Sequence, residues 1–385
     1  MSRIHITTLV VGMLVSGCAN SLLTKYQDNQ CISDCDDPNS RVNFEQPVFQ
    51  TVQMFIAEAA CWFIWLAMRP VRKDTLEYQA INTRDENDHG EITDASTAEA
   101  VAVSVATHGP LLSGKRLLLL AIPAFCDICG TTLMNVGLFY LPVSVYQMTR
   151  GSLVLFVGFM SVVFLKHHIS LRQWTGLMAV TGGLFVVGLS AVYGAHSEPA
   201  PVSAGPVRTP FQVVCGLLMI LGGQLFTASQ FVVEEHILNR FSLAPIKVVS
   251  WEGTFGSLLT IVGSAVLYAL IGSTSYGSVF NVWAAVIEAF SQKALIVSGI
   301  FIMISIAAFN FCGLSVTRSL SATSRSTIDT CRTLGIWLVS LSIGWEQFRF
   351  LQLFGFFLMV WGTLVFNGVI HEQKTPTEEE QRLTS

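Results

Sequence analysis

The chain has 385 residues, of which 51% are hydrophobic and only 12% are charged, and its formal net charge is −4. A typical soluble domain carries about 25% charged residues. This composition therefore excludes a soluble enzyme and a disordered scaffold, and the absence of a basic excess excludes a nucleic-acid-binding protein. The apolar residues fall in blocks of about 20, the length that a helix needs to cross roughly 30 Å of hydrocarbon. We therefore expect an all-α integral membrane protein with the lipid bilayer as its partner.

Ten predicted membrane spans follow one another along the chain. They are residues 4–23, 48–68, 117–138, 142–165, 172–193, 211–235, 247–271, 294–316, 321–344 and 350–370. A polar stretch at 69–116 predicts a disordered cytosolic loop, and a proline-rich stretch at 194–210 predicts a stiff linker. Residues 371–385 are expected to form a polar cytosolic tail.

The distribution of Lys and Arg sets the expected orientation. With both termini in the cytosol, most of the 22 Lys and Arg residues fall in cytosolic segments, as the positive-inside rule requires. The first span also imitates a secretory signal, and Val15-Ser16-Gly17-Cys18 imitates a lipoprotein cleavage site. Because few positive charges precede it and cleavage would break the repeat described next, we interpret 4–23 as the first membrane helix.

An internal repeat divides the chain into two units, 1–193 and 211–370. A Gln-x-x-Gly motif occurs at 173–176 and again at 352–355, and a further glycine follows seven residues after each. This spacing keeps both glycines on one helix face, where a neighbouring backbone can pack closely. Each unit has five helices, an odd number, so the second unit must be inverted relative to the first. A cavity then lies between the units and opens alternately to either side.

Charged residues inside the spans are a strong functional signal, because a charge at the centre of a membrane helix costs on the order of 2.5–3.5 kcal/mol. These residues are Glu58, Asp127, Arg150, Glu234, Glu252, Arg325, Asp329 and Arg332. In one interpretation, Glu58 forms an ion pair with Arg150 that holds two helices together, and Glu252 forms the equivalent pair with Arg332. In the other, the two arginines face a cavity and bind an anionic group. The carboxylates could also take up protons to drive transport.

The predicted polar path combines these charges with neighbouring amides. Its residues are Arg150, Arg332, Gln147, Asp329, Glu58, Glu252, Asn20 and Arg325. Gln224, Gln230 and Asn310 also indicate a wet interior, without identifying a ligand. The sequence Glu234-Glu235-His236 lies near the cytosolic end of the sixth span, and we expect a solvated surface there.

Two pairs of cysteines need separate interpretations. Cys31 and Cys35 fall in the first non-cytosolic loop, where an oxidising compartment would let them form a disulfide with each other or with a partner. Cys126-x-x-Cys129 imitates a redox or zinc motif, but it lies in an apolar helix without a second ligand pair, so we predict no metal site. The sequence has no phosphate-binding loop. We predict no catalytic residue, no cofactor and no enzymatic activity.

Four groups of motif residues, two in each half of the chain, carry a further signal. They are Tyr146-Gln147-Met148-Thr149-Arg150-Gly151 with Gln173-Trp174-x-Gly176, Cys18-Ala19-Asn20 through Lys25-Tyr26-Gln27-Asp28-Asn29, Val232-Val233-Glu234-Glu235, and Leu320-Ser321-Ala322-Thr323-x-Arg325 through Asp329-x-x-Arg332. Together they resemble the drug/metabolite transporter superfamily (EamA-like), and within it the F branch of the nucleotide-sugar-transporter-like solute carrier family 35, related to the chloroquine-resistance transporters. The resemblance implies a carrier of ten transmembrane helices in two inverted five-helix repeats.

The resemblance and the buried charges together predict a secondary active transporter that moves a small, polar or anionic organic solute by alternating access. A nucleotide-sugar antiporter of the Golgi or endoplasmic reticulum is an alternative. No lysine, however, lies in the interior of a span, whereas such antiporters typically place lysines in the cavity. A non-transporting membrane scaffold that acts through 69–116 is a third possibility. We expect a multi-pass protein of an endomembrane (Golgi, lysosome or vacuole, or endoplasmic reticulum), with a homodimer as an open alternative.

Overall fold

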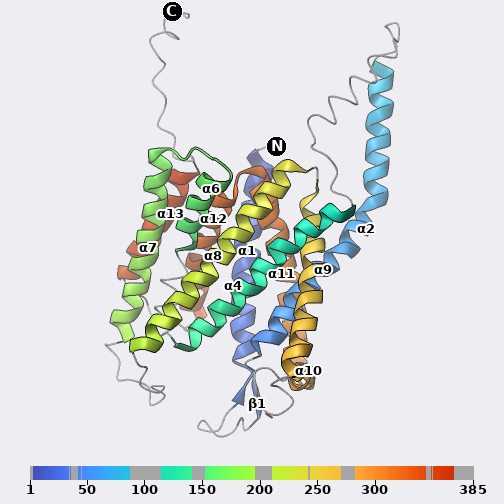
Figure 1. The fold of residues 1–385 in the computed structure, drawn as a ribbon. Helices are drawn as coiled ribbons and strands as arrows, with labels where there is room; N and C mark the ends of the chain where they lie inside the picture. Colours follow the sequence, from blue (N-terminus) through green and yellow to red (C-terminus); the bar gives the residue numbers. More distant parts are fainter. Residues whose placement is uncertain are drawn as a thin grey trace, which may run out of the picture.

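The computed structural model of the chain describes most of both halves. The described residues are 3–33, 35, 42–44, 46–86, 114–140, 152–195, 210–241, 243–269, 282–343, 348 and 350–367. Nearly all of them are helical, and the helices pack side by side as one bundle (Figure 1).

The bundle consists of helices, with one 3₁₀ helix and two short strands between them. In chain order the elements are α1 (Arg3–Asp28), β1 (Cys31–Ser33), β2 (Val42–Asn43), α2 (Pro47–Glu86), η1 (Gly114–Leu120), α4 (Ala121–Tyr140), α6 (Leu153–Phe164), α7 (Leu171–Ala195), α8 (Pro210–Arg240), α9 (Pro245–Leu267), α10 (Val282–Ser291), α11 (Lys293–Ser319), α12 (Ala322–Ile343) and α13 (Phe350–Phe366). A helix therefore occupies each of the ten predicted spans, at least in part.

The outer surface of the bundle is suited to lipid. Among the described residues, five helical segments are long and apolar enough to cross a bilayer: Ile4–Asp28, Pro47–Ala67, Arg116–Gly137, Val214–Arg240 and Lys293–Ser319. Large apolar side chains point outward, among them Phe63, Phe159 and Phe357, which are 76%, 61% and 66% exposed. Apolar side chains exposed over so many helices mark a surface that contacts lipid or another apolar partner.

Helix α2 is longer than its predicted span. The sequence predicts a disordered loop from residue 69, but α2 continues to Glu86, so the prediction is wrong for 69–86. After Pro70 this stretch contains no further proline and no glycine, the two residues that disfavour helix most strongly. Residues 87–113, most of the predicted linker at 194–210 and the predicted tail at 371–385 lie outside the described residues.

Two short features between the spans are absent from the sequence prediction. Helix α10 has only ten residues, with Trp283 and Ile287 exposed and Ala285 buried, so a search for apolar blocks long enough to span a membrane misses it. Strands β1 and β2 form a small antiparallel sheet, which the all-α prediction also misses because strands of three and two residues carry no readable alternation.

The small sheet carries the disulfide. Cys31 and Cys35 are bonded to each other, which settles between the two pairings that the sequence leaves open. The Gln292 side chain donates a hydrogen bond to the Cys31 carbonyl at 2.8 Å and so ties this loop to the start of α11. Figure 1 shows the sheet at one end of the bundle and the first residues of α1 at the opposite end, together with the polar extension of α2.

Most helix contacts join the first half of the chain to the second. The most extensive pairs are α7 with α13, α4 with α8, α1 with α11 and α2 with α9. Smaller contacts join α1 to α12, α6 to α8, α4 to α9, α2 to α11 and α6 to α12. The two halves are therefore interleaved in the bundle and do not form separate lobes.

Glycines allow the closest of these contacts. A Cβ atom added at Gly183 of α7 would lie 2.6 Å from the carbonyl oxygen of Gly355 on α13, and one added at Gly176 would lie 2.8 Å from that of Gly362. The predicted packing role of these glycines is confirmed. The order of the contacts also shows that α7 and α13 are antiparallel, since residue numbers rise along one helix as they fall along the other.

Helices α2 and α9 also touch backbone to backbone. A Cβ atom added at Gly253 of α9 would lie within 2.6 Å of the carbonyl carbon of Glu58 on α2. The side chain of Phe55 covers Gly256 one turn further along α9. This contact positions two acidic residues, Glu58 and Glu252, near each other.

Candidate functional site

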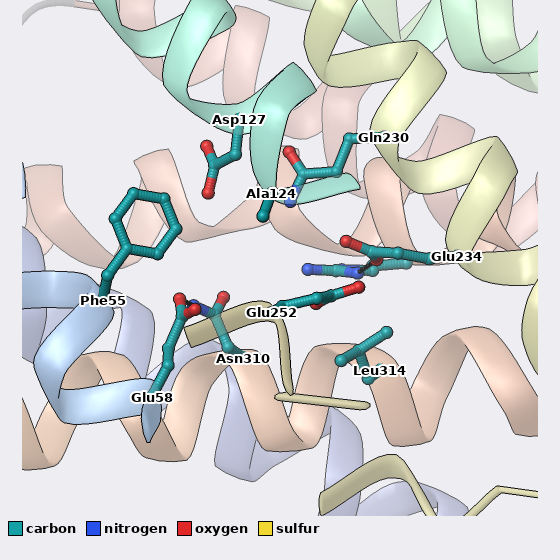
Figure 2. Close-up of a pocket in the computed structure, with 10 residues that line it drawn as sticks. Phe55, Glu58, Ala124, Asp127, Gln230, Glu234, Glu252, Asn310 and Leu314 are labelled. Atoms are coloured by element: carbon teal, nitrogen blue, oxygen red, sulfur yellow. Dashed lines mark hydrogen bonds and ion pairs between the residues drawn. The ribbon is translucent and has the colours of Figure 1, made fainter. Parts of the chain in front are cut away.

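A polar cavity lies among helices α2, α4, α8, α9, α11 and α12 (Figure 2). It is lined by Phe55, Glu58, Ala124, Asp127, Gln230, Glu234, Glu252, Asn310, Leu314 and Arg325. The cavity is largely enclosed and has room for about one water molecule. A buried space lined by so many ionisable groups is unusual in a membrane helix bundle, where each such group is costly.

Helical periodicity explains how the lining residues come together. Gln230 and Glu234 lie four residues apart on α8, and Asn310 lies four residues before Leu314 on α11, so each pair occupies one face of its helix. Figure 2 shows Asp127 of α4 reaching into the same space from the opposite side to these α11 residues. Each helix thus contributes only one narrow stripe to the site.

Arg325 is the cation in the described lining of the cavity, and it forms an ion pair. Its Nη1 atom lies 2.5 Å from Glu234 Oε2, and the two side chains are 3% and 1% exposed. The guanidinium group also lies over the ring of Phe231, 4.1 Å from the ring centroid, in a cation–π contact. A Cβ atom at Gly313 would lie 2.8 Å from Arg325 Nε, so this glycine makes room for the arginine.

Two other carboxyl groups have neutral hydrogen-bond donors. The side-chain amide of Asn310 donates to Glu58 Oε1 across the α2–α11 contact. The hydroxyl of Thr131, one turn further along α4, donates to Asp127 Oδ1 at 3.2 Å and also to the Asp127 carbonyl at 2.7 Å. Neither donor carries a charge that would balance a carboxylate.

Glu252 is the least satisfied of the four acids. It is 6% exposed, and its Oε1 atom has no hydrogen-bond partner among the described residues. Arg325 Nε is likewise buried without a partner in that part of the chain. Unsatisfied buried polar atoms are costly, and at a functional site they often mark where a ligand, a water molecule or a proton binds.

The structure brings together three of the predicted path residues, Glu58, Glu252 and Arg325. Gln147 and Arg150 lie outside the described residues, and so does the predicted ion pair between Arg150 and Glu58.

Arg332 and Asp329 lie apart from the cavity. Arg332 Nε is 3.4 Å from Asp329 Oδ1 within α12, and its guanidinium group lies 5.0 Å from the ring centroid of Phe309. The predicted ion pair between Glu252 and Arg332 is therefore wrong. Arg332 lies seven residues beyond Arg325, two turns along α12, and it packs against α1 and α11, whereas Glu252 of α9 faces the start of α12.

Asn20 is also absent from the cavity lining. Its side-chain oxygen accepts a hydrogen bond from the Ser305 hydroxyl at 3.3 Å, which joins α1 to α11. The structure thus gives Asn20 a partner that holds two helices together, and Asn20 is not part of the cavity wall.

Sequence reasoning omitted four polar residues of the cavity from the path: Asp127, Gln230, Glu234 and Asn310. The signal was present, because Asp127 and Glu234 are charges inside apolar spans and Gln230 precedes Glu234 by one helical turn. Only the tertiary packing shows that these stripes face one another. A three-residue window of polar letters is not enough to separate a buried face from a solvated one.

The expected solvated surface at 234–236 is wrong for its two acids, since Glu234 and Glu235 are each 1% exposed. Glu235 Oε2 accepts a hydrogen bond from the backbone N–H of Ala322 at 2.9 Å, at the first residue of α12. Its other oxygen lies 3.7 Å from His167 Nε2. Glu235 is therefore an anchor for the positive end of the α12 dipole, outside the cavity.

No group of three or more metal-ligating side chains occurs within the described ranges. Cys126 and Cys129 of α4 are free thiols there.

Known proteins resemble the chain over nearly its full length. A family model described as nucleotide-sugar transporter matches residues 102–248. An uncharacterized protein of Schizosaccharomyces pombe is 35% identical over 94% of this chain and 97% of its own length. Solute carrier family 35 member F6 of Homo sapiens is 32% identical over 93% of this chain and 87% of its own length.

The Pongo abelii member F6 is also 32% identical, over 96% of this chain and 92% of its own length. An experimentally solved protein chain of unspecified function shares the fold, with a TM-score of 0.50 and 14% sequence identity over the whole of both chains. Both the apolar helix bundle and the similarity to these solute carriers over nearly the full chain indicate an integral membrane protein. The chain is a multi-pass membrane protein that belongs to the nucleotide-sugar-transporter-like solute carrier family 35, in its F branch.

Proposed function

We propose that this protein is a secondary active carrier that moves a small polar organic solute across its membrane by alternating access. The observation that carries the proposal is the enclosed polar cavity, whose lining comes from both halves of the chain. Helices α2 and α4 supply one part of the wall, and α8, α9, α11 and α12 supply the other. A site lined by helices of two repeats can be exposed to either side by movement of one group of helices against another.

The pattern of helix contacts supports an inverted repeat. Matching α1, α2, α4, α6 and α7 in order with α8, α9, α11, α12 and α13 exchanges the contacts in pairs. Under this matching, the α4–α8 contact corresponds to the α1–α11 contact. The α6–α8 contact corresponds to the α1–α12 contact, and the α4–α9 contact corresponds to the α2–α11 contact. The contacts α2–α9, α6–α12 and α7–α13 map onto themselves. A two-fold relation between the halves predicts this pattern.

The direction of the helices supports the inversion. The matched helices α7 and α13 are antiparallel by their glycine contacts. The matched helices α6 and α12 are antiparallel too, because Ser161 near the end of α6 accepts a hydrogen bond from Thr323 near the start of α12. Repeats related by an axis in the membrane plane place matched helices in opposite directions.

The charge of the cavity limits the classes of solute that it would bind. The described wall has four carboxyl groups and one guanidinium group, and that guanidinium is already paired with Glu234. Such a wall favours a neutral polar or a cationic solute. The anionic solute that the sequence allows would depend on Arg150, which lies outside the described residues.

A nucleotide-sugar antiporter is the second candidate, favoured by the family model that matches residues 102–248. The acidic wall opposes the diphosphate of such a substrate by like-charge repulsion. Membership in a transporter family supports a non-enzymatic role in either case.

In the proposed orientation, the protein lies in an endomembrane and both of its termini are cytosolic. The disulfide between Cys31 and Cys35 lies at the end of the bundle opposite the first residues of α1. Disulfides persist in oxidising compartments such as the endoplasmic reticulum lumen. This arrangement supports a lumenal position for the small sheet.

Exchange across proteoliposomes tests the carrier function. Purified protein is first screened by thermal shift against amines, amino acids, dipeptides and nucleotide sugars, because a ligand that binds the folded state raises its Tm. The stabilising solute is then loaded inside liposomes, and uptake of labelled solute is followed. We expect saturable uptake that the internal solute accelerates. Folded protein that exchanges none of these solutes would contradict the proposal, and exchange of a nucleotide sugar would favour the second candidate.

A further inference from the structure

Three carboxyl groups of the cavity form no ion pair within the described part of the chain. Glu234 is balanced by Arg325. Glu58 and Asp127 accept hydrogen bonds from neutral donors, and Glu252 retains a buried oxygen without a partner. Fully ionised, the wall would therefore hold four negative charges against one positive charge.

The space between these groups cannot resolve the imbalance. With room for about one water molecule, the cavity lacks the bulk water that would screen the repulsion. An organic cation does not fit into a space of this size. Protonation of carboxyl groups removes the excess charge of the described wall in this enclosed conformation, and it is the usual response of a buried acid without a counter-charge.

We propose that the cavity is a proton-binding site and that protons drive the carrier, an inference that rests on the proposed function. Among the described residues, the charged and titratable groups that face it are Glu58 of α2, Asp127 of α4, Glu234 of α8, Glu252 of α9 and Arg325 of α12, while α11 contributes the uncharged Asn310 and Leu314. Glu58, Asp127 and Glu252 carry the exchangeable protons. Glu234 is not among them, because it is paired with the guanidinium group of Arg325.

Coupling follows from the difference between enclosed and open conformations. When the cavity opens to one side, water enters and a carboxylate is tolerated. When it closes, the ionised form loses this solvation, so the closed form binds protons more tightly. By thermodynamic linkage, protonation must then favour closure to the same extent. A proton gradient across the membrane would thus bias the direction in which the cavity turns over.

Charge displacement after a pH jump tests the proposal without knowledge of the solute. Proteoliposomes adsorbed on a solid-supported membrane are switched from about pH 8.5 to about pH 5.5, a range in which buried carboxyl groups titrate. We expect a transient current from proton entry, and its loss in the triple variant E58Q/D127N/E252Q. A sodium jump at constant pH should give no current.

The controls keep each outcome decisive. E288Q makes the same chemical change in α10, outside the cavity, and should keep the wild-type current. The proposal is overturned if a folded triple variant gives the wild-type current, or if a sodium jump gives a current that the triple variant loses. If the triple variant does not fold, the single variants E58Q, D127N and E252Q decide, and an unchanged current in all three overturns the proposal.

Failure of the coupling and failure of the carrier function are distinguishable. Solute exchange without an ion gradient tests the carrier alone. A protein that exchanges solute but gives no pH-jump current is a carrier without proton coupling. A protein that gives the current but exchanges no solute binds protons without acting as a carrier.

Discussion

Arg325 supplies the positive charge of the described cavity wall. It pairs with Glu234, lies over the ring of Phe231 and fills the space beside Gly313. A buried ion pair seldom stabilises a protein more than an apolar pair would, but breaking one by removal of a single partner is costly. The energetic role of the arginine therefore depends on the presence of its acid.

We expect Arg325→Met to lower the free energy of unfolding by about 3–5 kcal/mol, because it leaves the Glu234 carboxylate buried without a counter-charge. The measurement is the Tm of detergent-purified protein, taken at one heating rate because membrane proteins often unfold irreversibly. The double variant Glu234→Gln/Arg325→Met should regain most of the lost Tm. A double variant as unstable as the single one would show that the ion pair is not the cause.

At the scale of the helices, backbone contacts through glycine hold matched helices together. Gly183 offers a matched comparison with its neighbour, because an added Cβ at Gly182 meets nothing within 4 Å. The two positions share a helix and its propensity, and they differ only in what they face.

We expect Gly183→Ala to lower the free energy of unfolding by about 1–3 kcal/mol through overpacking against α13. Gly182→Ala should leave the Tm unchanged or raise it, since alanine is the better helix former by about 1 kcal/mol. Thermal unfolding of both variants side by side checks the prediction. Equal effects of the two substitutions would mean that α7 and α13 are not in close contact.

The sequence predicts where the helices lie along the chain far better than it predicts which side chains of different helices face one another. Blocks of apolar residues are long signals, so every predicted span contains a helix. The partner of Glu252 is a different problem, because it depends on how α9 and α12 rotate against each other, and the predicted partner Arg332 lies two turns from the observed cavity residue Arg325. The surface interpretation of Glu234 failed for the same reason.

At the scale of the whole molecule, deletion of the segment between α2 and η1 distinguishes a carrier from a scaffold that acts through this segment. None of the residues that line the cavity belongs to this segment. We expect deletion of 87–113 to leave the rate of solute exchange in proteoliposomes close to that of the full chain, because no cavity residue is removed. Loss of exchange in a variant that still elutes as a folded protein would favour a role for the segment in function.

The proposed orientation makes a separate prediction. In sealed vesicles with the cytosolic face outward, a membrane-impermeant maleimide should not label Cys31 or Cys35, even after reduction by a permeant phosphine. Labelling should appear once detergent opens the vesicles, because the disulfide faces the lumen. Labelling of intact vesicles would reverse the orientation. The variant Cys31→Ser/Cys35→Ser provides the background from the other cysteines.

The backbone contact at Gly253 has a mechanical consequence. Because no side chain separates Gly253 from the backbone of α2, the two helices have little freedom to move relative to each other at this point, and Glu58 and Glu252 would move together. The distance between these acids would then stay nearly constant through a transport cycle. What would change is the distance between these two acids and helices α4, α8 and α12, as those helices move towards the acids or away from them. The carrier would alter its affinity for protons by moving the walls around a fixed pair of acids.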